Sequence, residues 1–138
     1  MAIDGNRIRT WIRGPPYRDP MPIIEIHALP QGRDLDVPTA LAEVTSAVAA
    51  FLGEEPRGTW AIWRPVEPGA YAEGADAPST QPRGSHPAIV DVFAGRRDDA
   101  PELLRAVGRA VVEAFGLDDG NVVVRLTAAE PGRVYWSD

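Results

Sequence analysis

The side chains able to do chemistry in this 138-residue chain are carboxylates, two histidines and a set of arginines. There are no cysteines, which rules out disulfides and thiolate metal ligands. His27 and His86 are too few for a histidine-rich metal site, so we expect no metal and no cofactor. All 14 basic residues are arginine. With that bias, any single arginine is weaker evidence for guanidinium chemistry than it would be in a lysine-rich chain.

Two stretches of sequence repeat one order of elements that would position these groups. In the first, Pro22 precedes a short apolar, β-branched run over 23–29, which predicts a largely buried strand. Asp36 is the expected N-cap of a helix that ends at Gly53, and residues 59–63 predict a second strand. The apolar positions of this helix recur at helical spacing: Leu41, Val44, Val48, Phe51 and Leu52.

The same order returns at Pro87. Residues 87–93 predict a strand, Asp99 the N-cap of a helix that ends at Gly116, and residues 121–126 the closing strand. Arginines occupy the turn after the first strand of each unit, Arg33 in one and Arg96 with Arg97 in the other. The second helix has its apolar stripe at Leu104, Val107, Val111 and Phe115.

A strand, a helix and a parallel strand joined in this way form a right-handed crossover. We therefore predict an α+β fold (two-layer α/β) of two tandem β-α-β units, with a four-stranded mixed sheet and both helices on one face. Residues 1–20 form an N-terminal extension with at most a short strand around 8–12, and 21–138 form one domain. Within it, unit one covers 21–65, a connector 66–86 and unit two 87–138.

The second face of such a sheet would have no helix over it. Its strands are still apolar, and we expect Trp60 or Trp63 and Val122 or Val124 to lie there. An uncovered apolar face indicates a buried partner surface, so we expect a homo-oligomer.

Charge and hydropathy limit the classes of partner that the protein can have. The net charge of −6 argues against a nucleic-acid surface, which needs a basic face. No apolar run reaches the ~20 residues of a membrane helix, and the N-terminus lacks the apolar stretch of a secretory signal. We expect a cytoplasmic protein with no membrane or nucleic-acid partner.

The run from Met21 to Leu29, followed by Gly32-Arg33 and a helix, resembles the opening of the 4-oxalocrotonate tautomerase family. The internal duplication resembles the fused branches of that superfamily, which include malonate semialdehyde decarboxylases, cis-3-chloroacrylate dehalogenases and macrophage migration inhibitory factor. The resemblance covers residues 21–138. It implies the tautomerase fold, a homotrimer and a small keto or enol acid as substrate.

The resemblance also implies a catalytic amine. In that family the mature chain begins at proline, whose secondary amine moves a proton between carbon and oxygen. Desolvation of such an α-amino group lowers its pKa toward neutrality, where proton transfer is most effective. Only Pro22 matches this residue, because Pro87 follows His86 in mid-chain.

Further site residues follow from the same resemblance. Arg33, Arg96 and Arg97 match arginines that bind the substrate carboxylate, and Arg125 matches one that polarises the carbonyl. In unit one the same count reaches Trp60 or Ala61, so that half has lost this arginine, and Arg64 is an open substitute. Trp136 and Tyr71 match aromatic residues that line the pocket.

Each of these residues also has a structural interpretation. The turn arginines could be solvated, Arg125 could form an intersubunit salt bridge, and Tyr71 and Trp136 could be packing aromatics. His27 is expected to be a hydrogen-bonded structural histidine and Glu130 a solvated turn carboxylate. The decarboxylase branch carries a carboxylate where this chain reads Gly58-Thr59, which leaves plain tautomerisation as the favoured reaction.

The function depends on where the mature chain begins: either residues 1–20 come from a start codon chosen too far upstream, or the extension is real. Pro22 follows 21 residues here, so its nitrogen is a tertiary amide with no basic lone pair. The leading hypothesis is a tautomerase/isomerase in a mature form that begins at Pro22. The alternative is a non-catalytic or amine-independent oligomer of the same fold, a binding or scaffold protein with Pro22 in mid-chain.

Overall fold

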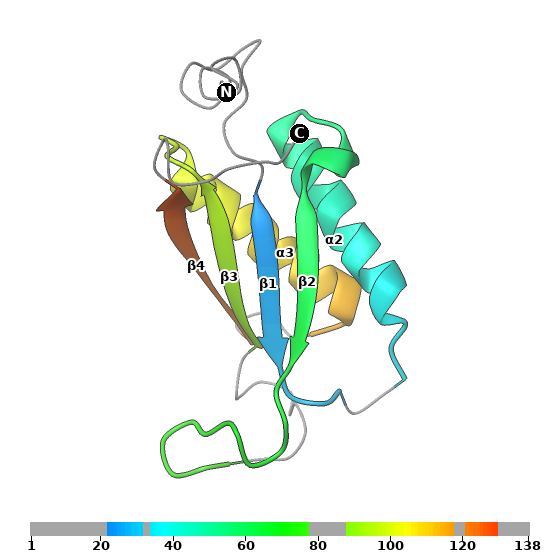
Figure 1. Ribbon diagram of the computed structural model, residues 1–138, viewed down its shortest axis with the longest axis vertical. Coiled ribbons are helices and arrows are strands. Elements are labelled where there is room, and N and C mark those ends of the chain that lie inside the picture. The colour runs from blue at the N-terminus through cyan, green and yellow to red at the C-terminus, as the bar shows by residue number, and fades with distance from the viewer. Residues whose placement is uncertain (1–21, 32–33, 78–87, 118–120, 130–138) are drawn as a thin grey trace, which may run out of the picture.

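The computed structural model describes residues 22–31, 34–77, 88–117 and 121–129. Two helices lie on one face of a single sheet (Figure 1). The elements follow in the order β1 (Ile23–Ala28), α2 (Val37–Leu52), the 3₁₀ helix η1 (Pro56–Gly58), β2 (Trp60–Pro65), β3 (Ala88–Gly95), α3 (Ala100–Phe115) and β4 (Val122–Ala129).

The sheet has the strand order β2-β1-β3-β4, with two parallel pairs joined by one antiparallel pair. β1 is parallel to β2, and β3 is parallel to β4. β1 and β3 meet antiparallel at the centre, with Ile23 opposite Phe93 and Glu25 opposite Asp91. This is the mixed four-stranded sheet with two β-α-β units predicted from the sequence, and the fold prediction is confirmed.

Helix α2 forms where local signals place it. The Asp36 carboxylate accepts a hydrogen bond from the Thr39 backbone N–H at 3.2 Å, which satisfies one of the free amides of the first turn. Pro38 stands in that first turn, where its missing N–H costs nothing. Gly53 ends the helix with φ of 69°, a left-handed conformation that glycine adopts without strain.

Helix α3 repeats this arrangement with one difference. Asp99 occupies the N-cap position, but its carboxylate makes no capping bond and is held by Arg97 instead. Gly116 again ends the helix with a positive φ of 65°. The buried stripe of α3 consists of Leu103, Val107, Ala110, Val111 and Phe115.

The core lies between the helices and the inward-facing side chains of the sheet, since alternate strand residues point to opposite faces. Trp63 of β2 stacks on Phe115 of α3, with ring centroids 4.8 Å apart and an interplanar angle of 9°. Of the tryptophans in β2, Trp60 is therefore the one on the open face.

Three sequence-based expectations were wrong in detail. Val122 and Val124 pack toward the core, and Val123 is the β4 valine exposed on the open face, because the alternation of β4 starts one residue out of step with the prediction. Phe51 is 41% exposed rather than buried, since Ala49 takes the core position in the last turn of α2. β2 continues through Pro65, which is tolerated because β2 is an edge strand.

The boundary at residue 20 and the expected short strand near residue 8 lie outside the described residues. The described part of the connector, 66–77, holds one isolated bridge between Glu73 and Asp76 and no regular strand. Within the described residues, no helix combines the length and apolarity needed to cross a membrane.

Phe115→Ala should destabilise the fold by about 3–5 kcal/mol, because it removes a fully buried ring and leaves Trp63 without its stacking partner. The matched control is Phe51→Ala, which truncates a half-exposed ring and should change stability by about 0.5 kcal/mol or less. Urea unfolding followed by fluorescence measures both. Equal losses for the two variants would contradict the assignment of Phe115 to the core.

Candidate functional site

Pro22 stands at the edge of the sheet where β1 begins. Because β1 is parallel to β2 and antiparallel to β3, the start of β2 and the end of β3 lie at the same edge (Figure 1). Pro22 is buried, and its carbonyl oxygen accepts a hydrogen bond from the Trp60 N–H at 3.1 Å. The structure therefore brings Pro22 together with residues that enter β2 on one side and residues that leave β3 on the other.

On the β3 side the turn after Gly95 carries Arg96 and Arg97. Arg97 donates through Nε and Nη2 to the two oxygens of Asp99, at 2.6 and 2.9 Å. The Arg97 guanidinium holds the pKa of the Asp99 carboxyl below its usual range. Asp99 thereby fixes the orientation of the Arg97 side chain and also offsets part of its positive charge. An anion bound at Arg97 would therefore share the guanidinium with the Asp99 carboxylate.

On the β2 side, continuing the β1–β2 register by one position makes Thr59 the neighbour of Pro22. Thr59 is 5% exposed, and its hydroxyl oxygen is buried with no hydrogen-bond partner. A buried polar group left unsatisfied costs about 1–3 kcal/mol. The sequence analysis named Gly58-Thr59 only as the place where the decarboxylase branch carries a carboxylate and gave Thr59 no role in the site, because a threonine at the start of a strand is ordinary strand composition.

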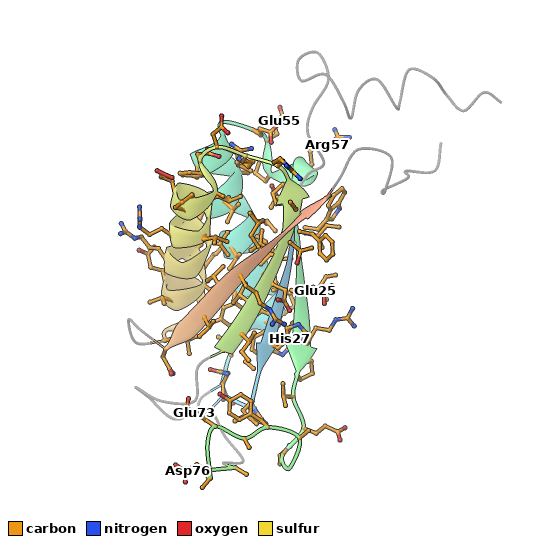
Figure 2. All side chains as sticks on the ribbon, turned by 90° about the vertical axis from the view of Figure 1, so that its left-hand side faces the viewer. Glu25, His27, Glu55, Arg57, Glu73 and Asp76 are labelled. Carbon is orange, nitrogen blue, oxygen red and sulfur yellow. The ribbon has the colours of Figure 1, made fainter. Side chains whose placement is uncertain are left out.

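Arg57 lies two residues before Thr59, in η1, and Figure 2 shows it near the same end of the sheet. It is exposed, and none of the described residues forms a hydrogen bond or ion pair with it. The sequence analysis did not single it out. The feature of the sequence that could have identified Arg57 is its position directly before the second strand of unit one.

The open face of the sheet carries a second polar group, away from the Pro22 edge. Carboxylates lie beside arginine or histidine side chains there, in a group that we call the charged chain: Arg64, Glu25, His27, Asp91 and Arg125. Arg64 Nε donates to Glu25 at 3.2 Å, and His27 Nε2 lies 3.8 Å from Glu25 and 3.3 Å from Asp91. Arg125 donates to both oxygens of Asp91. Glu25 and His27 project together from β1 in Figure 2.

This charged chain lines an open hollow of about 390 Å³, with Phe93 and Thr127 beside it. The hydrogen bond from Arg125 lowers the pKa of Asp91 and the same bond raises the pKa of Arg125. Each carboxylate thus has a cation within the chain. His27 lies between the carboxylates of Glu25 and Asp91.

The predicted site residues do not all meet. Arg96 and Arg97 share the end of the sheet with Pro22, whereas Arg125 lies midway along the outer strand β4 with an intrachain partner, Asp91, rather than beside Pro22. Tyr71 follows β2 at the opposite end of the sheet, where partial burial, and then the Glu73 carboxylate, raise its pKa. Arg33, Trp136 and Glu130 lie outside the described residues.

No cluster of three or more histidine, aspartate or glutamate side chains suited to a metal ion occurs in the described segments.

Comparison with known proteins gives a consistent fold. No protein-family model matches the sequence, and no curated protein matches it significantly. A fused 4-OT wild-type asymmetric trimer superposes with a TM-score of 0.62 at 14% identity, over 78% of this chain and 85% of that one. Native Ps01740 gives 0.62 at 19%, over 83% and 99%, and malonate semialdehyde decarboxylase gives 0.62 at 16%, over 84% and 91%.

These similarities confirm, at the level of fold, the resemblance to two-unit tautomerases predicted from the sequence. The chain shares its fold with the fused 4-OT proteins and with malonate semialdehyde decarboxylase.

Asp91→Asn should flatten the acid limb of the stability curve. The pKa of Asp91 is depressed in the folded chain, so its contribution to stability is present above its unfolded value of about 3.9 and is lost as the pH falls through the lower folded value. At neutral pH the loss should be about 1 kcal/mol or less, since Arg125 is largely exposed.

Urea midpoints measured from pH 7 to pH 2 test this expectation. Asp34→Asn, which alters an exposed carboxylate before α2, should keep the wild-type dependence. An unchanged acid limb in Asp91→Asn would show that the pair with Arg125 contributes nothing in solution.

Proposed function

We propose that the protein is a tautomerase that moves a proton between carbon and oxygen of a small carboxylate-bearing keto or enol acid, with Pro22 as the amine base. The observation that carries this proposal is the convergence of Pro22 with Arg96 and Arg97 at one edge of the sheet. A base and cations at the same edge are what the reaction requires, since the base takes the proton and the cations hold the acid.

The chemistry requires a free amine at Pro22. In a chain that begins at this residue, the secondary amine has a lone pair that can accept a proton from the carbon next to the carbonyl. The same amine can return the proton at the other end of the enolate. The burial of Pro22 supports such a role, because a buried amine is biased toward its neutral, basic form.

Arginines would provide the rest of the site. Arg96 and Arg97 are proposed to bind the substrate carboxylate, with Asp99 holding Arg97 in place. Arg33 and Trp136 are proposed as further substrate contacts on the strength of the sequence resemblance alone. Arg125 and Tyr71 lie elsewhere in a single chain, so their proposed roles depend on a neighbouring copy that presents them to Pro22.

We further propose that the chain forms a homotrimer through its open sheet face. Four large apolar side chains there are more than a third exposed: Trp60, Ile62, Phe93 and Val123. The charged chain between them is internally paired and needs no opposite charge from a partner. The fused 4-OT proteins of the same fold are described as symmetric and asymmetric trimers, which supports this assembly.

A chain that starts at Pro22 should ketonise phenylenolpyruvate or 2-hydroxymuconate, and the 138-residue chain should be slower by about 10²–10⁴-fold, the usual contribution of a general base. Initial rates by ultraviolet absorbance measure this. The control is a Pro22-initiated chain that carries N-terminal acetylation, in which the same fold lacks the basic lone pair.

N-terminal mass analysis of protein from its native host decides whether the amine form occurs. A mature chain that retains the residues before Pro22 would exclude the amine mechanism. A full-length chain as active as the Pro22-initiated chain would also exclude it and would indicate an amine-independent reaction. A mature chain that retains those residues and is inactive would leave the binding or scaffold protein as the interpretation, which the open apolar face favours.

Phe93→Glu should convert the trimer to monomers, because it replaces an exposed apolar ring of the open face with a carboxylate that a partner must bury. Light scattering after size exclusion gives the mass. Phe51→Glu, on a helix and equally exposed, is the matched control and should leave the mass unchanged. If the Phe93→Glu variant is still a trimer, the interface does not lie on the open sheet face.

A further inference from the structure

The turn that leads into β2 carries two polar groups that the structure leaves without partners. One is the buried hydroxyl of Thr59, and the other is the exposed guanidinium of Arg57. Both flank Pro22 on the side away from Arg96 and Arg97, because β1 lies between β2 and β3 in the sheet. Neither is explained by packing or by helix capping.

Thr59 lies next to the Pro22 ring. Neighbouring strands are ~4.8 Å apart, and side chains at the same register point to the same face. Ile23 and Trp60 are paired and both face the open side, so Pro22 and Thr59, one position earlier, share the opposite side. A hydroxyl is rarely buried without a hydrogen bond unless something else supplies one. Its position makes a ligand at Pro22 the nearest candidate acceptor.

Arg57 supplies the charge. Its guanidinium has five N–H donors in a planar fork, and within the described segments no carboxylate takes them up. Glu54 and Glu55 precede it and lower the local positive potential, yet neither pairs with it. Arg97, in contrast, already shares two donors with Asp99. Arg57 is therefore a cation at this end of the sheet that an incoming acid can bind without displacing a carboxylate of the described residues.

We propose that Arg57 and Thr59 form an anion subsite on the β2 side of Pro22 that binds the carboxylate of a small organic acid. This deepens the proposed function and rests on it for the role of Pro22. The subsite belongs entirely to unit one, the half in which Trp60 or Ala61 stands at the position equivalent to Arg125. With this subsite, Pro22 has arginines on both sides: Arg57 next to β2, and Arg96 with Arg97 after β3.

The subsite can be tested by binding rather than by turnover. Isothermal titration of the 138-residue chain with phenylpyruvate should give a dissociation constant that Arg57→Ala raises by about 10-fold or more, the usual value of a charge-assisted hydrogen bond. Thr59→Val should raise it about 3–10-fold, and Thr59→Ser should restore it. Arg109→Ala, which removes an exposed arginine of α3, is the control and should leave it unchanged.

Melting temperatures show whether a substitution at Thr59 weakens ligand binding or destabilises the fold. Because the Thr59 hydroxyl is unsatisfied, Thr59→Val should leave the melting temperature unchanged or raise it while it weakens binding. A lower melting temperature together with unchanged binding would make Thr59 a structural residue and overturn the inference. The same holds if the wild-type chain binds no phenylpyruvate at millimolar concentration, or if Arg57→Ala binds as tightly as Arg109→Ala.

These outcomes are independent of the amine mechanism. If Pro22-initiated protein does not ketonise enol acids, yet Arg57→Ala still weakens phenylpyruvate binding, then the proposed reaction fails and the anion subsite stands. If the protein is active and Arg57→Ala and Thr59→Val leave both the affinity and the KM unchanged, then the reaction stands and the subsite does not exist.

Discussion

The antiparallel pairing of β1 with β3 is the constraint on which the rest of the structure depends. Each unit by itself yields only a parallel pair of strands and a helix. The central pairing places Ile23 opposite Phe93 and Glu25 opposite Asp91, and so decides which strand ends share an edge. It brings the start of unit one to the end of the first strand of unit two. Pro22 and the turn with Arg96 and Arg97 lie at the same end of the sheet for this reason.

Capping residues and apolar spacing made the helices and strands predictable from the sequence. The side-chain pairs between distant strands could not be predicted from these local features. Asp36, Gly53 and Gly116 act through neighbours within a few residues, so their roles could be inferred from sequence. The pair between Asp91 and Arg125 joins residues 34 positions apart and depends on the β3–β4 register. The same limit explains Val123, since a shift of one residue exchanges the two faces of a strand. Arg57 was missed because nothing nearby in sequence marks an unpaired cation.

The two units have kept their architecture and diverged in how they use equivalent positions. Asp36 caps its helix, while Asp99, at the same place in the repeat, holds Arg97 and leaves the first turn of α3 without a side-chain cap. The helix tolerates this loss because its stability comes mainly from a buried face that includes Val107, Val111 and Phe115. A position that stabilises one unit has thus become available for orienting a side chain in the other.

The stacked rings of Trp63 and Phe115 belong to different copies of the repeat. The first comes from the edge strand of unit one and the second from the last turn of the unit-two helix. The halves are therefore not interchangeable modules, since a copy of unit one alone would expose an indole and a copy of unit two alone a phenyl ring. Once a two-unit chain contains this stack, neither unit can be stable as a separate single-unit chain without replacing its exposed aromatic residue, because each half completes the core of the other.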